Sequence, residues 1–96
     1  MTTIPLCDLS PGAYALVERL DTLGQMRRRL LDLGLTPGAP VCCVGSSPGG
    51  DPAAYRVRQT ILALRRADAA TIWVRPVEEA ESYGADQRSR GAGCGT

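Results

Sequence analysis

The chain has 96 residues and a formal net charge of +1, from 11 arginines and 10 acidic residues. This length suits one small domain and excludes a large catalytic fold such as a (β/α)8 barrel, which needs about 250 residues. The sequence has no histidine, which removes imidazole bases, histidine-paired nucleophiles and nitrogen ligands for metals. We therefore expect no enzyme activity.

The first residues, Met1–Pro5, lack the basic start and apolar run of a signal peptide. No stretch of the sequence approaches the 18 or more apolar residues of a membrane span. We therefore expect a cytoplasmic location, in which the cysteines stay reduced.

A strand followed by a helix is predicted in the first third of the chain. After a Pro-Gly turn, the run Ala13–Leu20 contains β-branched and aromatic residues without a breaker, which predicts a strand. The pattern does not decide which face of this strand points inward. A helix is predicted over about 22–33, with a capping box of Thr22 and Gln25 at its start and Gly34 at its end. Four apolar residues recur there at helical spacing, and we expect this stripe to cover one barrel mouth. The stripe consists of Leu23, Met26, Leu30 and Leu33.

Short strands with intervening turns fill the rest of the body. Strands are predicted over 41–44, 55–58, 61–64 and 72–74, and one helical turn over 65–70. About five strands this short bury little as an open sheet, whereas curling into a barrel removes the exposed edges. The predicted fold class is all-β with one short helix, a small SH3-like β-barrel. Trp73 is expected to anchor the last strand.

The predicted domain covers residues 1–76, and the composition changes after it. Residues 77–96 are acidic at first, end in a glycine-rich run and contain few large apolar side chains. Such a segment cannot bury enough apolar surface to offset the entropy lost on ordering. We therefore predict a disordered tail, with room for a helical turn at 77–82.

The helix and the turn after it resemble the FeoA family. The segment Met26–Gly38, which ends Leu-Asp-Leu-Gly-Leu-Thr-Pro-Gly, is similar to the family's helix-to-turn block. The loop Pro48–Pro52 is similar to the family's Gly-Asp-Pro loop, and Tyr55–Arg58 is similar to the strand after it. With further matches over 62–74, the resemblance covers about residues 4–76. The chain differs where the family has a turn glycine, because Gln59 stands there.

The resemblance implies a small cytosolic SH3-like barrel of bacterial ferrous-iron uptake. It implies a non-catalytic accessory or regulatory protein, which binds the cytosolic GTPase region of a FeoB-like transporter and meets the membrane only through that partner. The alternative is an SH3-like module in metal-dependent transcriptional regulation or nucleic-acid binding, since related domains occur in iron-dependent repressors. A net charge of only +1 argues against a nucleic-acid partner.

Three arginines lie off the apolar stripe of the helix and have two interpretations. Arg27, Arg28 and Arg29 form either a solvated face, with Arg28 paired to Asp32, or a docking face for an acidic partner. The family resemblance favours docking. Leu31 and Leu35, at the edge of the stripe, are the candidates for an exposed apolar patch beside them.

The cysteines do not predict a metal site. Neighbouring strand residues face opposite ways, so Cys42 and Cys43 make a poor ligand pair, with one thiol buried and the other half-exposed; Cys94 is the other candidate ligand. The loop Pro48–Pro52 lacks the lysine of a phosphate-binding loop, so no cofactor is expected. Because a body of about 76 residues buries little surface, weak homo-oligomerisation is expected.

Overall fold

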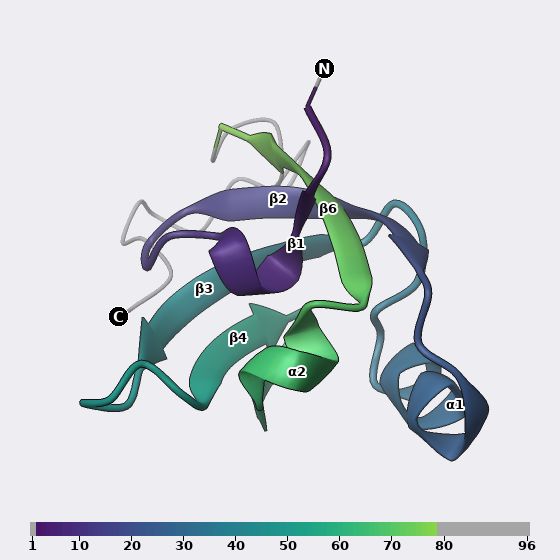
Figure 1. The fold of residues 1–96 in the computed structure, drawn as a ribbon. Helices are drawn as coiled ribbons and strands as arrows, with labels where there is room; N and C mark the ends of the chain where they lie inside the picture. Colours follow the sequence, from purple (N-terminus) through teal and green to yellow (C-terminus); the bar gives the residue numbers. More distant parts are fainter. Residues whose placement is uncertain (1, 79–96) are drawn as a thin grey trace.

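Residues 2–78 are described by a computed structural model, in which six antiparallel strands form one curved sheet (Figure 1). The sheet order is β1-β6-β2-β3-β4-β5. In chain order the elements are β1 (Ile4–Pro5), the 3-10 helix η1 (Leu6–Asp8), β2 (Tyr14–Leu20), α1 (Gly24–Asp32), β3 (Pro40–Ser46), β4 (Ala53–Val57), β5 (Thr60–Leu64), α2 (Arg66–Ala69) and β6 (Ile72–Val77).

The curved sheet is closed into a barrel by its two short helices. The helix η1 follows the edge strand β1, α2 follows the other edge strand β5, and the two helices contact each other on one side of the sheet (Figure 1). The Tyr55 hydroxyl donates to the Leu6 carbonyl at 3.4 Å, and Arg66 Nη2 lies 3.7 Å from Asp8 Oδ1. The predicted small SH3-like barrel is confirmed, although β1 and η1 were not predicted.

Alternating side chains of the strands fill the barrel. On β2, Ala15 and Val17 face the core, and a bulge between Val17 and Arg19 lets Leu20 face it too. On β3, Cys43 packs into this core while Cys42 packs with Tyr14 on the other face of the sheet. The opposite orientation of the two thiols is confirmed, but the expectation of a half-exposed one is wrong, since both are buried.

The helix α1 is shorter than predicted and projects from one end of the barrel (Figure 1). The predicted capping box is wrong: Leu23 precedes the helix in an extended conformation, and the Thr22 hydroxyl is hydrogen-bonded to that of Thr71. Because the helix starts after Leu23, that side chain is 83% exposed, contrary to the predicted stripe. Leu30 alone of the helix is fully buried, and the partly buried Met26 and Leu31 pack against the core beside it.

The end of α1 follows the prediction closely. The Gly34 amide donates to the Leu31 carbonyl at 3.1 Å, and the Leu35 amide donates to the Leu30 carbonyl at 3.0 Å. This is a Schellman motif, in which Gly34 has a φ of 112° that other residues rarely adopt. The motif reverses the chain and brings Leu35 against Leu30 in the core.

The C-terminal part of the body agrees with the prediction in type but not in length. The expected helical turn is α2, whereas β6 continues through Pro76 to Val77, which the prediction assigned to the tail. The rest of that tail, from residue 79, lies outside the described residues. Within residues 2–78, no helix is long and apolar enough to span a membrane.

Candidate partner-binding surface

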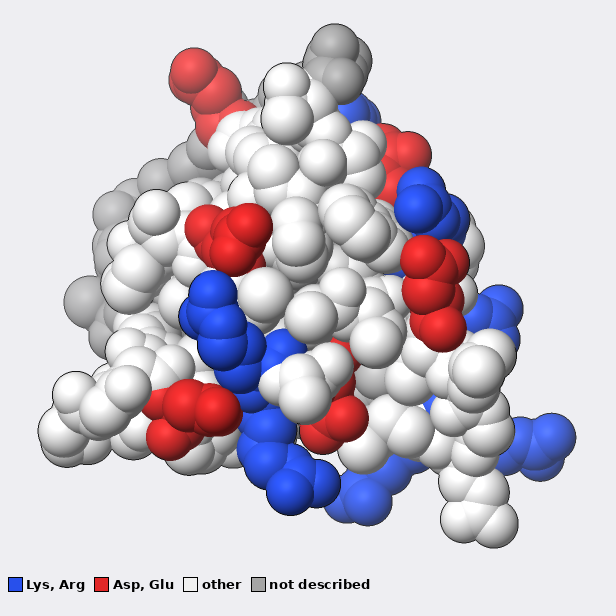
Figure 2. Space-filling view, in the orientation of Figure 1, with Lys and Arg blue, Asp and Glu red and all other residues white. Residues whose placement is uncertain are grey.

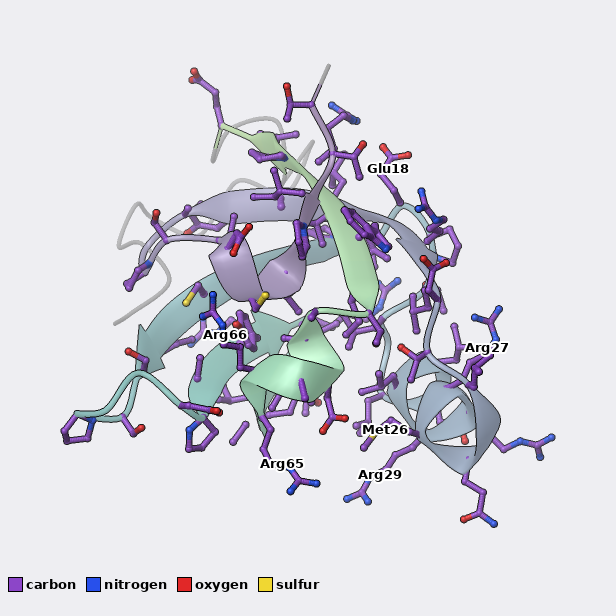
Figure 3. All side chains as sticks on the ribbon, viewed as in Figure 1. Glu18, Met26, Arg27, Arg29, Arg65 and Arg66 are labelled. Carbon is purple, nitrogen blue, oxygen red and sulfur yellow. The ribbon has the colours of Figure 1, made fainter. Side chains whose placement is uncertain are left out.

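The base of α1 is fixed to the barrel by Arg27. Its Nη1 donates to the Leu20 carbonyl at the end of β2, at 2.8 Å. This bond satisfies a backbone acceptor and holds the first turn of α1 against β2. Arg27, which Figure 3 labels above α1, therefore has a structural role besides the docking role predicted for it.

A second set of contacts surrounds the connection between β2 and α1. Trp73 Nε1 on β6 donates to Asp21 Oδ2 at 2.9 Å, and Arg19 Nε donates to Asp21 Oδ1 at 3.2 Å. The Arg19 guanidinium also lies 5.1 Å from the centroid of the Trp73 ring, within cation–π range. Trp73 thus anchors the last strand to the segment that follows β2, as expected.

The outer side of α1 presents two arginines that are available to a partner. Arg28 and Arg29 are exposed, and neither forms an ion pair with any residue in 2–78. The Arg28–Asp32 pair considered from the sequence does not form. A shallow depression runs along this face, and it is lined by Gly24, Gln25, Arg28, Arg29, Asp32 and Leu33. Figure 2 shows arginines gathered along the lower edge of the molecule, around α1 and α2.

The apolar part of this surface differs from the prediction. Leu35 is fully buried, so its expected place in an exposed patch is wrong, because the Schellman motif turns it inward. Leu31 is half-buried and packs against the core. The exposed leucine is Leu23, which sequence periodicity had assigned to the interior. The sequence pattern did not reveal that the helix starts after Leu23.

The three cysteines of the described chain do not gather at one site. Cys42 and Cys43 lie on opposite faces of β3, and Cys94 lies outside the described residues. Burial, with a contribution from neighbouring Asp8, raises the pKa of the half-buried Cys7 thiol and keeps it protonated at neutral pH. Among residues 2–78, no three Cys, Asp or Glu side chains gather as metal ligands.

The small barrel of short antiparallel strands places this chain in the SH3-like class of modules. The chain belongs to the FeoA family: the family's model, described as the FeoA domain, matches residues 4–76. The match includes every described element of the barrel except the last residue of β6.

A curated relative joins such a domain to a transporter. The Fe(2+) transport protein A/Fe(2+) transporter FeoB fusion protein of Porphyromonas gingivalis (strain ATCC BAA-308 / W83) is 36% identical over 69 residues. The match covers 72% of this chain but only 8% of the relative. The chain therefore corresponds to a small part of that protein.

Solved structures of FeoA proteins share the fold. The FeoA protein of Chlorobium tepidum is 31% identical, with a TM-score of 0.74 over 91% of this chain and 85% of its own. The FeoA of Stenotrophomonas maltophilia, solved with zinc and described as a procaryotic SH3 domain protein, is 33% identical, with a TM-score of 0.66 over 77% and 89%. A manganese-dependent transcriptional repressor, 18% identical with a TM-score of 0.69 over 78% and 42%, shares the fold alone.

Proposed function

We propose that this protein is a non-catalytic cytoplasmic accessory protein of ferrous iron transport, which binds the cytosolic GTPase region of a FeoB-like transporter. The observation that carries the proposal is the relative in which a homologous domain and FeoB occupy one chain. Covalent linkage holds two partners at a high effective concentration, and separate chains need a binding surface to achieve the same association. The FeoA of Stenotrophomonas maltophilia has likewise been considered a ferrous iron transport activating factor.

The projecting helix is the part of the described chain best suited to this contact. Leu23 offers an exposed apolar side chain at its start, and Arg28 and Arg29 offer guanidinium groups that form no ion pair with residues 2–78. Arginine is enriched at protein interfaces because its planar group forms paired hydrogen bonds with carboxylates. Binding would change transport only through different affinities for two states of the transporter, since equal affinity shifts no equilibrium.

The first prediction concerns Arg28 and Arg29. The double change Arg28→Gln/Arg29→Gln should weaken binding to the purified FeoB-like transporter of the same genome by about tenfold or more, because it removes two charged interface donors. Affinity is measured by biolayer interferometry in detergent, without nucleotide, with GDP and with a non-hydrolysable GTP analogue. A difference between the nucleotide states would identify the state that the protein stabilises.

The matched control is Arg66→Gln/Arg75→Gln. It removes the same charge from residues that are engaged in exposed ion pairs with Asp8 and Glu18. Such pairs contribute about 1 kcal/mol or less, so the control should stay folded and bind like the wild type. Absence of wild-type binding in all three nucleotide conditions would reject the proposed function.

A further inference from the structure

We propose that the docking surface extends from α1 onto the turn between β4 and β5, where Arg58 completes a set of guanidinium groups for carboxylates of an acidic protein partner. The inference depends on the proposed function only for the identity of the partner. The chemistry that it assigns to the surface comes from the positions and the pairing of the arginines.

Arg58 lies against the end of α1. The strands β4 and β5 are joined after the pair Val57 and Thr60, so Arg58 occupies the two-residue turn between them. A methyl group added to Gly34 would lie 3.3 Å from Arg58 Cδ and 3.4 Å from its Nε. The arginine stem therefore crosses over Gly34, directly after α1, and brings the guanidinium to the side of the helix end.

The backbone of Arg58 is in an unusual conformation for an arginine. Its φ is 60°, and it is the one non-glycine residue in 2–78 with a positive φ. Glycine or asparagine adopts this conformation more easily. We take this unfavourable residue in a tight turn as a sign that its side chain has a role other than stability. A role at the surface fits, because Arg58 is exposed and forms no ion pair with the described residues.

Charge pairing over the rest of the described chain supports an acidic partner. The ion pairs in residues 2–78 are Arg19–Asp21, Arg65–Asp68, Arg66–Asp8 and Arg75–Glu18. In contrast, Arg28, Arg29 and Arg58 around α1 have no such pairs within residues 2–78, and Asp32 is the one acidic residue of the helix. Arg27, which bonds the Leu20 carbonyl, and the half-buried Arg56 on β4 also lack ion pairs with the described residues. The surface around α1 is therefore locally positive, and carboxylates of a partner would neutralise it.

The test uses Arg58→Asn, because asparagine tolerates a positive φ and preserves the turn. We expect affinity for the transporter to fall by about tenfold, while the melting temperature stays unchanged or rises. A second variant, Arg58→Gly, should behave in the same way and controls for any contact made by the asparagine. The matched control is Arg66→Asn, whose side chain lies far from α1 in Figure 3 and is paired with Asp8. Wild-type affinity of both Arg58 variants would overturn the inference and leave the proposed function standing.

A second experiment, without the transporter, tests the inference independently of the proposed function. A deca-glutamate peptide is titrated into 15N-labelled full-length protein, and the arginine Nε–H signals are followed by NMR. Shifts concentrated at Arg28, Arg29 and Arg58 support the inference even if the transporter itself does not bind. No shift, or equal shifts at the paired Arg66 and Arg75, overturns it. Tight binding to phosphatidylglycerol vesicles without any response to the peptide also overturns it, in favour of a lipid surface.

Discussion

The phenol of Tyr55 lies inside the barrel, where β4 faces η1. The side chain is 2% exposed, and its hydroxyl donates to the Leu6 carbonyl at 3.4 Å. Burial, with smaller contributions from the thiols of Cys43 and Cys7, raises the pKa of Tyr55 to about 12 from an ordinary value of 10.0. The neutral phenol is thus the form that the folded barrel accommodates.

This shift predicts a loss of stability at alkaline pH. In the unfolded chain the phenol loses its proton near pH 10, whereas in the folded chain it keeps the proton until about pH 12. The contribution of the neutral Tyr55 phenol to the free energy of unfolding is therefore complete below pH 10. It falls by roughly 2 kcal/mol as the pH rises from 10 to 12. Urea unfolding at pH 8 to 11.5 measures the effect through Trp73 fluorescence. Tyr55→Phe lacks the titrating group and should flatten the slope; equal slopes would disprove the assignment.

At the scale of elements, local signals predicted the end of α1 but not its start. The Schellman motif at Gly34 uses bonds between residues five or fewer apart, such as Leu35 to Leu30, so a glycine at the right spacing was sufficient. The start depends on a partner far along the chain, because the hydroxyl expected to cap the helix, that of Thr22, instead meets Thr71. A capping signal in the sequence cannot reveal such a competitor.

The same distinction separates the predicted and unpredicted parts of the proposed docking surface. Arg28 and Arg29 could be placed from helical spacing, because exposure on a helix follows its period. Arg58 could not be associated with them, since only the fold brings the β4–β5 turn over Gly34. Leu20 shows the limit for strands: the bulge on β2 moves it to the core face, and strict alternation from Val17 would place it outside.

Neighbouring arginines on α1 offer a test of how the helix is held. Arg27→Ala removes the bond to the Leu20 carbonyl, whereas Arg28→Ala removes a neighbouring side chain that forms no ion pair within the described part of the chain. Both changes alter helix propensity equally. We expect amide hydrogen exchange within Gly24–Asp32 to accelerate by about tenfold in Arg27→Ala, since a hydrogen bond to a charged group contributes about 1.5 kcal/mol. Equal exchange in the two variants would show that Arg27 does not anchor the helix.

At the scale of the whole molecule, the barrel depends on η1 for closure. The β1 strand pairs only through Ile4 and Pro5, so backbone bonding alone holds this edge weakly. Leu6 compensates, because it is fully buried in the core and its carbonyl accepts from Tyr55. The segment before β2 is consequently part of the domain core, although no pattern in the sequence predicted a strand or helix there.

This arrangement predicts that Leu6→Ala will destabilise the whole barrel by about 2 to 4 kcal/mol, as expected for a cavity in a core. Urea unfolding should be measured beside Leu23→Ala, which removes the same atoms from a side chain that is 83% exposed and should change stability by about 0.5 kcal/mol or less. A large effect at Leu6 with none at Leu23 would separate the leucine that closes the barrel from the one available to a partner. If Leu6→Ala instead unfolds like the wild type, η1 is a peripheral turn and the barrel is closed by α2 alone.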